Sequence, residues 1–187
     1  MATESIVSRM IRAAKLDKAF YNEVEADTSL TNEALMVVII GAAASGAGGL
    51  ISGLFGGFGA ALTAMVVNVL MVIVGYFIWV YVTHFVGTRF FGGTGDAGEL
   101  RRTLGYAMAP QVLNILNFIP CVGWIISLVV WIWTLVAGFI AVREGMDLDN
   151  TKAIVTVAVG WLIILIVSAI LMMIFGIGAF AVSAITG

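Results

Sequence analysis

Between Glu33 and Arg89 the chain reads ALMVVIIGAAASGAGGLISGLFGGFGAALTAMVVNVLMVIVGYFIWVYVTHFVGT, without a single Lys, Arg, Asp or Glu. About 20 helical residues cross the ~30 Å hydrocarbon layer of a bilayer. The stretch is therefore long enough for two spans, and the glycines of residues 52–59 offer a place for the turn between them. It predicts membrane helices at about residues 33–53 and 60–87.

The same character extends over most of the chain, which is 61% hydrophobic and only 11% charged. Soluble domains carry about 25% charged residues, so the composition predicts an all-α, polytopic membrane helix bundle. A second uncharged stretch contains Pro120, whose ring interrupts a helix, and predicts a hairpin with arms at about 104–119 and 122–142. A re-entrant loop is the alternative. Pro110 is expected to kink the first arm, and a last span is predicted at about 153–176.

Basic residues collect in cytoplasmic loops, and this rule gives the orientation independently of hydropathy. With five spans, all nine Lys and Arg fall on one side. They are Arg9, Arg12, Lys15 and Lys18 in the tail, Arg89, Arg101 and Arg102 in the second loop, and Arg143 and Lys152 in the fourth. The pattern predicts a cytoplasmic N-terminus and an outer C-terminus. Because three crossings would give the same pattern, the rule does not decide whether the Pro120 hairpin crosses fully.

Residues 1–30 are predicted to form a cytoplasmic or interfacial segment that precedes the transmembrane domain of residues 31–187. Apolar side chains follow one helical face of this segment, and basic side chains flank it. They are Val7, Met10, Ile11, Ala14 and Tyr21 on the face, with Arg9, Arg12 and Lys15 beside it. This indicates an amphipathic helix in the headgroup layer, with its basic groups on anionic lipid. A short cytosolic helix packed on the protein's own loops is the alternative.

Small residues recur every four positions at Gly49, Gly53, Gly57 and Ala61. This spacing lets another helix approach closely. Packing within the chain is favoured over a homodimer face.

Amide side chains step by three along the first arm of the hairpin, at Gln111, Asn114 and Asn117. In lipid they need partners, either on other helices, for instance near Asn68, or in a hydrated path for a small solute. Bonding between helices is the simpler interpretation because no ionisable residue accompanies them, and coupled transport usually needs one. A small-solute channel or transporter is kept as the alternative function.

The sequence predicts no catalytic residue, metal site or cofactor, because no nucleophile, base and acid are gathered in it. His84 is the only histidine, and a pigment- or haem-binding subunit that uses it is a further alternative. Residues 92–99 are rich in glycine but lack the ending of a phosphate loop, so a flexible connector is expected. Trp79 and Trp131 are expected to anchor or pack membrane helices. A net charge of −2 argues against nucleic acid as a partner.

Several features occur in a recognisable order after the second span. They are the stretch LGYAMAP at 104–110, the pair Ile119-Pro120, Trp131 and Trp133 with Gly138, and the return at 145–153. In this order the chain resembles the Yip domain, a family of Ypt/Rab-interacting five-pass membrane proteins and their prokaryotic relatives. The resemblance covers roughly residues 30–175.

The resemblance implies five helices, a cytoplasmic N-terminus and a non-enzymatic scaffolding or membrane-organising role of trafficking type. Its eukaryotic members bind small GTPases through cytoplasmic segments, but this chain has a short basic tail instead of a long one, which counts against GTPase binding. The expected partners are the lipid bilayer and either a second copy or another membrane protein. A prokaryotic plasma membrane is the expected location, or the Golgi or ER membrane in a eukaryote.

Overall fold

The computed structural model describes the backbone of residues 4–186 and the side chains of residues 4–170 and 173. Every regular element in this part of the chain is a helix, as predicted. The order is α1 (Ile6–Ala14), α2 (Lys18–Ala26), η1 (Thr28–Leu30), α3 (Thr31–Gly53), η2 (Leu54–Gly56), α4 (Phe58–Phe91), α5 (Ala97–Ala107), η3 (Ala109–Phe118), α6 (Gly123–Gly145) and α7 (Asn150–Thr186), where η marks a 3₁₀ helix.

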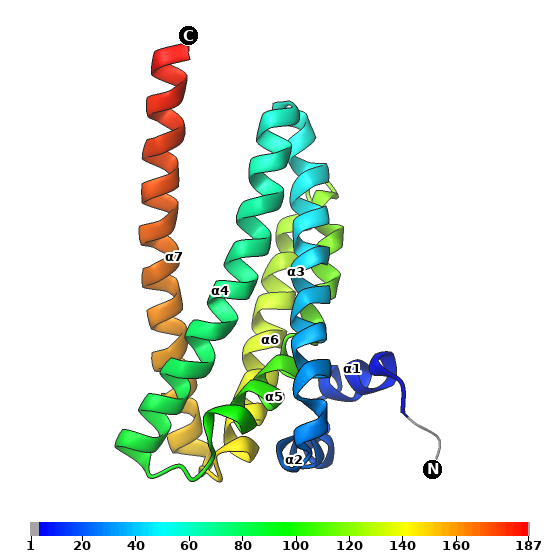
Figure 1. Ribbon diagram of the computed structural model, residues 1–187. Helices are drawn as coiled ribbons and strands as arrows, with labels where there is room; N and C mark the ends of the chain where they lie inside the picture. The colour runs from blue at the N-terminus through cyan, green and yellow to red at the C-terminus, as the bar shows by residue number, and fades with distance from the viewer. Residues whose placement is uncertain (1–3, 187) are drawn as a thin grey trace.

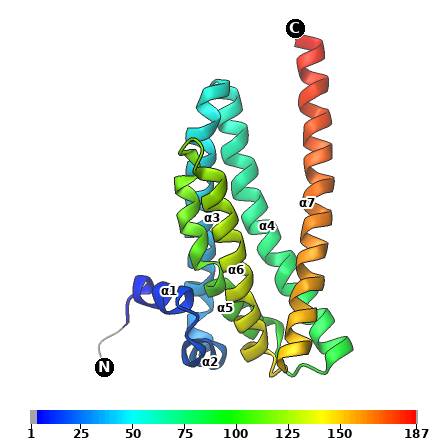
Figure 2. The same ribbon diagram turned by 180° about the vertical axis from the view of Figure 1, so that it is seen from behind.

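The chain runs along the long axis of the bundle in alternating directions through α3, α4, η3, α6 and α7 (Figures 1 and 2). One end, here called the basal end, carries α1, α2, α5, the end of α4 and the α6–α7 turn (Figure 1). All nine Lys and Arg belong to segments at this end. Helix α7 runs from the basal end to the opposite end of the molecule (Figure 1). Which side of a membrane the basal end faces stays a prediction.

Four helices in the described part of the chain are long and apolar enough to cross a membrane. They are Thr28–Gly56, Phe58–Phe91, Gly123–Gly145 and Asn150–Ile170, close to four of the five predicted spans. The molecule is therefore a polytopic helical membrane protein, while a fifth full crossing stays a prediction.

The predicted third span, 104–119, differs from an ordinary membrane helix. It consists of the last turn of α5 followed by the ten-residue 3₁₀ helix η3. Proline has no N–H and its ring blocks the preceding turn, so Pro110 ends the α-helical bonding. The Gln111 N–H then donates to the carbonyl of Met108 at 2.9 Å, which is the shorter 3₁₀ bond. The expected kink at Pro110 is thus a change of helix type. A 3₁₀ helix rises about 2.0 Å per residue, so this short arm reaches further than ten α-helical residues would.

Small residues of α3 set its distance from two neighbours. A Cβ on Gly48 would clash with the backbone carbonyl of Asn114 in η3, and one on Gly53 would lie 2.6 Å from the Cα of Ala61 in α4. A Cβ on Gly49 would lie 2.7 Å from the Asn68 side chain, also in α4. Three members of the predicted series thus lie where α3 packs on α4. Gly57 does not, because it has a positive φ of 96° in the turn before α4 and has open space around it.

The glycine-rich loop 92–96 is hydrogen-bonded to the α6–α7 turn at the basal end. The Thr94 N–H donates to the carbonyl of Met146 at 3.2 Å, and the Thr94 hydroxyl donates to Asp147 at 2.5 Å. A Cβ on Gly95 would clash with the carbonyl of Gly145. The glycine here permits close backbone packing, which differs from the flexible connector expected for this loop.

Candidate functional site

The predicted single amphipathic helix is two helices, α1 and α2, here together called the N-terminal module. The break falls at Leu16, which has a φ of 63°, and Asp17 then caps α2 by accepting from the Phe20 N–H at 3.3 Å. In both views α1 lies across the direction of the membrane helices at the basal end (Figures 1 and 2).

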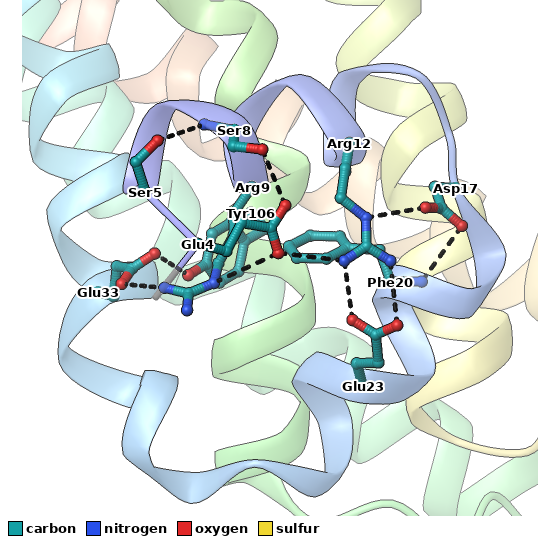
Figure 3. A network of polar contacts seen from close by, with 10 residues as sticks. All are labelled: Glu4, Ser5, Ser8, Arg9, Arg12, Asp17, Phe20, Glu23, Glu33 and Tyr106. Atoms are coloured by element: carbon teal, nitrogen blue, oxygen red, sulfur yellow. Dashed lines mark hydrogen bonds and ion pairs between the residues drawn. The ribbon is translucent and has the colours of Figure 1, made fainter. Parts of the chain in front are cut away.

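An ion-pair cluster around Arg12 fixes the angle between α1 and α2 (Figure 3). The guanidinium donates to both oxygens of Glu23 at 2.9 and 3.0 Å and to Asp17 at 3.0 Å. It also pairs with Glu4 at 3.2 Å and lies 4.9 Å from the centre of the Phe20 ring. Hydrogen bonding to Arg12 lowers the pKa of Asp17. One cation thus joins three carboxylates from different parts of the module.

A second cluster ties the module to the membrane helices (Figure 3). Arg9 donates to Glu33 in the first turn of α3 at 2.5 Å, and the Tyr106 hydroxyl of α5 donates to the other oxygen of Glu33 at 2.6 Å. Phe20 packs edge-on against Tyr106, with ring centres 5.1 Å apart. Segments far apart in the sequence, α1, α2, α3 and α5, therefore meet at one point.

Two further side chains hold the module from the other side. Arg102 of α5 is only 5% exposed, and its guanidinium donates to the backbone carbonyls of Val24, at 3.0 Å, and Glu25. The Trp133 indole of α6 donates to the carbonyl of Ala14 at 2.7 Å. Each bond satisfies a carbonyl at the end of one helix of the module, where no intrahelical partner exists.

The residues predicted to touch the lipid surface differ in their surroundings. Arg9 and Arg12 are bonded to the chain's own carboxylates, whereas Lys15 is exposed. The exposed apolar groups of α1 are Val7 and Ile11, at 59% and 49% exposure. Contact of all three basic residues with anionic lipid stays a prediction. Arg9 and Arg12 also have a structural role, because they pair with carboxylates of the protein itself.

We expect the module to be held more firmly at mildly acidic pH because of Glu25. Burial is the main cause that raises the pKa of Glu25 from 4.5 to about 7, and repulsion from the nearby carboxylates of Asp147, Glu99 and Glu144 adds to it. A carboxyl with a raised pKa binds its proton more tightly in the folded state, so stability falls as the pH rises from about 4.5 to 7 and then levels off. Glu25→Gln, which cannot ionise, should gain in melting temperature over the wild type across that window. A melting-temperature difference between Glu25→Gln and the wild type that stays the same at every pH would contradict this account.

The second feature is a cavity of about 480 Å³ inside the bundle, between α3, α4, η3, α6 and α7. All four residues of the predicted polar path, Asn68, Gln111, Asn114 and Asn117, line it. The sequence did not place the other polar or aromatic lining residues at this cavity. These are Ser45, Tyr76, Trp79, Ser127, Trp131, Thr134 and Trp161. Hydroxyls in otherwise apolar spans were the available signal for four of them.

The 3₁₀ form of η3 explains why its three amide side chains lie in one row. With three residues per turn, side chains at i and i+3 lie directly above one another, so Gln111, Asn114 and Asn117 form a straight row. Asn114 donates to Ser45 of α3 at 3.3 Å and also to Gln111, and Ser127 of α6 donates to Asn117 at 2.9 Å. The row therefore does bond to other helices and also faces the cavity.

Several polar atoms of the cavity walls have no hydrogen-bond partner among the described residues. They are Asn114 Oδ1, Thr134 Oγ1, Trp79 Nε1 and Trp161 Nε1, each buried. An unsatisfied buried group costs about 1–3 kcal/mol, and such groups are rare in native proteins. Trp79 and Thr134 are 0% exposed, so their polar atoms face the packed side chains of the bundle and not the open part of the cavity.

Trp79 forms the basal end of the cavity. Its ring lies at 5.5 Å from that of Trp161, which in turn lies at 5.0 Å from Trp131. A Cβ on Gly138 would clash with the Trp79 ring, so this glycine makes room for it in α6. Below this level Val80, Thr83, Ala137 and Ala141 are all fully buried, so the cavity ends here.

His84 does not line the cavity. No group of three His, Cys, Asp or Glu that could hold a metal occurs in the described part of the chain. A haem or pigment site at His84 stays a hypothesis.

The geometry defines an integral membrane protein, a helical bundle with the N-terminal module fastened at one end. The family model of the Yip1 domain matches residues 17–185. The chain belongs to this family, as the order of its sequence features suggested. No match was found among curated proteins or among solved structures. Membership supports a membrane-associated role of trafficking type, in a family that is generally not enzymatic.

Proposed function

We propose that the chain is a non-enzymatic membrane-organising protein, whose bundle anchors a preformed docking surface for a partner protein. The observation that carries the proposal is the fastening of the N-terminal module by Arg9, Arg12, Arg102 and Trp133. A surface that is already ordered before binding loses less conformational entropy when a partner arrives. The charge pattern supports placing this surface on the cytoplasmic face.

A photo-crosslinking amino acid at Asn22, which is exposed on α2, tests this proposal in intact cells. The expected result is a discrete adduct with a partner protein or a second copy, lost when Arg102→Ala releases the module. The control position is Phe55, 84% exposed at the far end of the bundle, where the same adduct should not form. A protein that stays monomeric and without adducts at Asn22 would count against a docking function.

A small-solute path is the second candidate, supported by the gathering of Asn68, Gln111, Asn114 and Asn117 around one cavity. The buried layer beneath Trp79 counts against a continuous pore. Liposome flux that disappears when the three amides of η3 become leucine would support the path. Flux that stays the same would remove it.

A further inference from the structure

A groove of about 410 Å³ lies between α1 and the membrane helices, apart from the cavity described above. Its walls come from α1, α3, α6 and residues 109–113, where η3 begins. All its lining residues are hydrophobic. Three of them are exposed, Val7 at 59%, Ile11 at 49% and Leu113 at 36%, so the groove is open to the surroundings of the bundle.

Two wall residues show why this groove suits an apolar chain and not water. The Trp133 indole N–H donates to the carbonyl of Ala14 at 2.7 Å, so the polar atom of this side chain and the end of α1 satisfy each other. Pro110 has no N–H to offer. A water molecule in a cavity needs about two to four polar partners. The groove therefore fits a ligand that makes only van der Waals contacts along its length.

The depth of the groove matches the layer where lipid chains begin. Glu33 carries the last charge before the uncharged stretch of α3 and α4, and it binds Arg9 of α1 at 2.5 Å. Ile40 lines the groove seven residues later, about 10 Å further along α3. An interfacial helix buries its apolar face about 5–10 Å into the boundary between headgroups and chains. The groove thus extends from the level of α1 into the apolar layer.

One cation beside the groove is left for a lipid head. Arg9 and Arg12 pair with the protein's own carboxylates, whereas Lys15 is exposed. Lys15 directly follows Ala14, which lines the groove, and its long flexible side chain carries a point charge suited to a phosphate. A basic group at this place favours a lipid with a net negative head.

We propose that this groove binds one acyl chain of an anionic phospholipid, whose head pairs with Lys15. The chain lies under α1, along the start of η3, and fills the space between the N-terminal module and the bundle. Four elements enclose it, so it is held more firmly than the lipids that touch a single helix face. This site is independent of the docking function proposed above.

The proposal is tested in phosphatidylcholine nanodiscs that contain a small amount of a photoreactive lipid with a diazirine in one chain. The lipid is either phosphatidylglycerol or phosphatidylcholine with the same chains. One lysine near a lipid surface favours an anionic head roughly fivefold, so phosphatidylglycerol should label residues 6–14 and 109–113 about fivefold more. The exposed stretch 66–74 of α4, which does not line the groove, should be labelled equally by both lipids. Equal labelling of the groove residues by both would overturn the proposal.

Ala14→Leu tests the groove itself, because the larger side chain takes up space that the acyl chain needs. It should remove most of the labelling of residues 109–113. Ala19→Leu is the matched control, since Ala19 is exposed on α2 and does not line the groove, and it should leave the labelling unchanged. Full labelling of Ala14→Leu would overturn the proposal.

Lys15→Gln is a surface variant that tests the head without altering the groove. It should lower the labelling by phosphatidylglycerol to the level of phosphatidylcholine. Lys152→Gln, at an exposed lysine in the first turn of α7, should not. An unchanged preference for phosphatidylglycerol in Lys15→Gln would contradict the proposed pairing. Displacement of phosphatidylglycerol by an equal amount of free fatty acid with the same chain would assign the groove to fatty acids and overturn the proposal.

Discussion

Replacing Arg102 by alanine is expected to release the N-terminal module from the bundle. The buried guanidinium donates to the carbonyls of Val24 and Glu25, and its loss leaves both acceptors at the end of α2 without these bonds. Hydrogen bonds to charged groups contribute about 1.5–3 kcal/mol each, so docking should weaken by about 2–4 kcal/mol after partial compensation by water. The amides of α2 should then lose roughly 30- to 1,000-fold in hydrogen-exchange protection if they exchange by undocking.

Arg101 provides the matched control for this experiment. It is the preceding residue of α5 with the same charge, and its Nε has no hydrogen-bond partner among the described residues. Arg101→Ala should change stability by less than about 0.5 kcal/mol. Arg102→Lys should rescue poorly, because an ammonium lacks the planar fork that reaches two carbonyls. Unchanged hydrogen-exchange protection of the α2 amides in Arg102→Ala would contradict this prediction, because the remaining contacts would then be enough to hold the module in place.

The second large effect is expected at the contact between α3 and η3. A Cβ on Gly48 would clash with the backbone carbonyl of Asn114, and a backbone segment cannot turn aside as a side chain can. Gly48→Ala should therefore push η3 away from α3 and cost about 1–3 kcal/mol of stability, measured by thermal unfolding in detergent. Gly59→Ala, in open space on α4, should be neutral or stabilising.

The outcome at Gly48 also bears on the cavity. Moving η3 displaces the row of Gln111, Asn114 and Asn117 and separates Asn114 from Ser45. Gly48→Ala should therefore change the polar wall of the cavity as well as lower the stability. Wild-type stability in this variant would contradict the close contact of α3 and η3.

Much of this architecture could be predicted because it depends on local composition. The long stretches without charged residues predicted the four long helices. The positions of the nine Lys and Arg predicted that these residues gather at one end of the bundle. Gln111, Asn114 and Asn117 stood out because amides are costly in lipid wherever they lie. The order of features after the second span was enough to suggest the family.

Other features depend on contacts between distant parts of the chain. The break at Leu16 follows no glycine or proline, and tertiary contacts such as Trp133 with Ala14 hold the two helices of the module in place. The pairing of Arg9 with Glu33 spans 24 positions, so the flanking arginines looked like lipid contacts. Trp79 could not be placed in the cavity from sequence, since this depends on which residues of α6 and α7 lie opposite.

The five-span topology predicts that the hairpin of η3 and α6 crosses the membrane and places the Pro120 turn on the face opposite the N-terminal module. The lone cysteine, Cys121, is exposed in this turn and serves as a native label site. The comparison protein carries Cys121→Ser together with Asn22→Cys in the module. A membrane-impermeant maleimide should label Cys121 in intact cells and should label the comparison protein only after permeabilisation. Labelling of Cys121 only after permeabilisation would show a re-entrant loop or the reverse orientation and contradict the account.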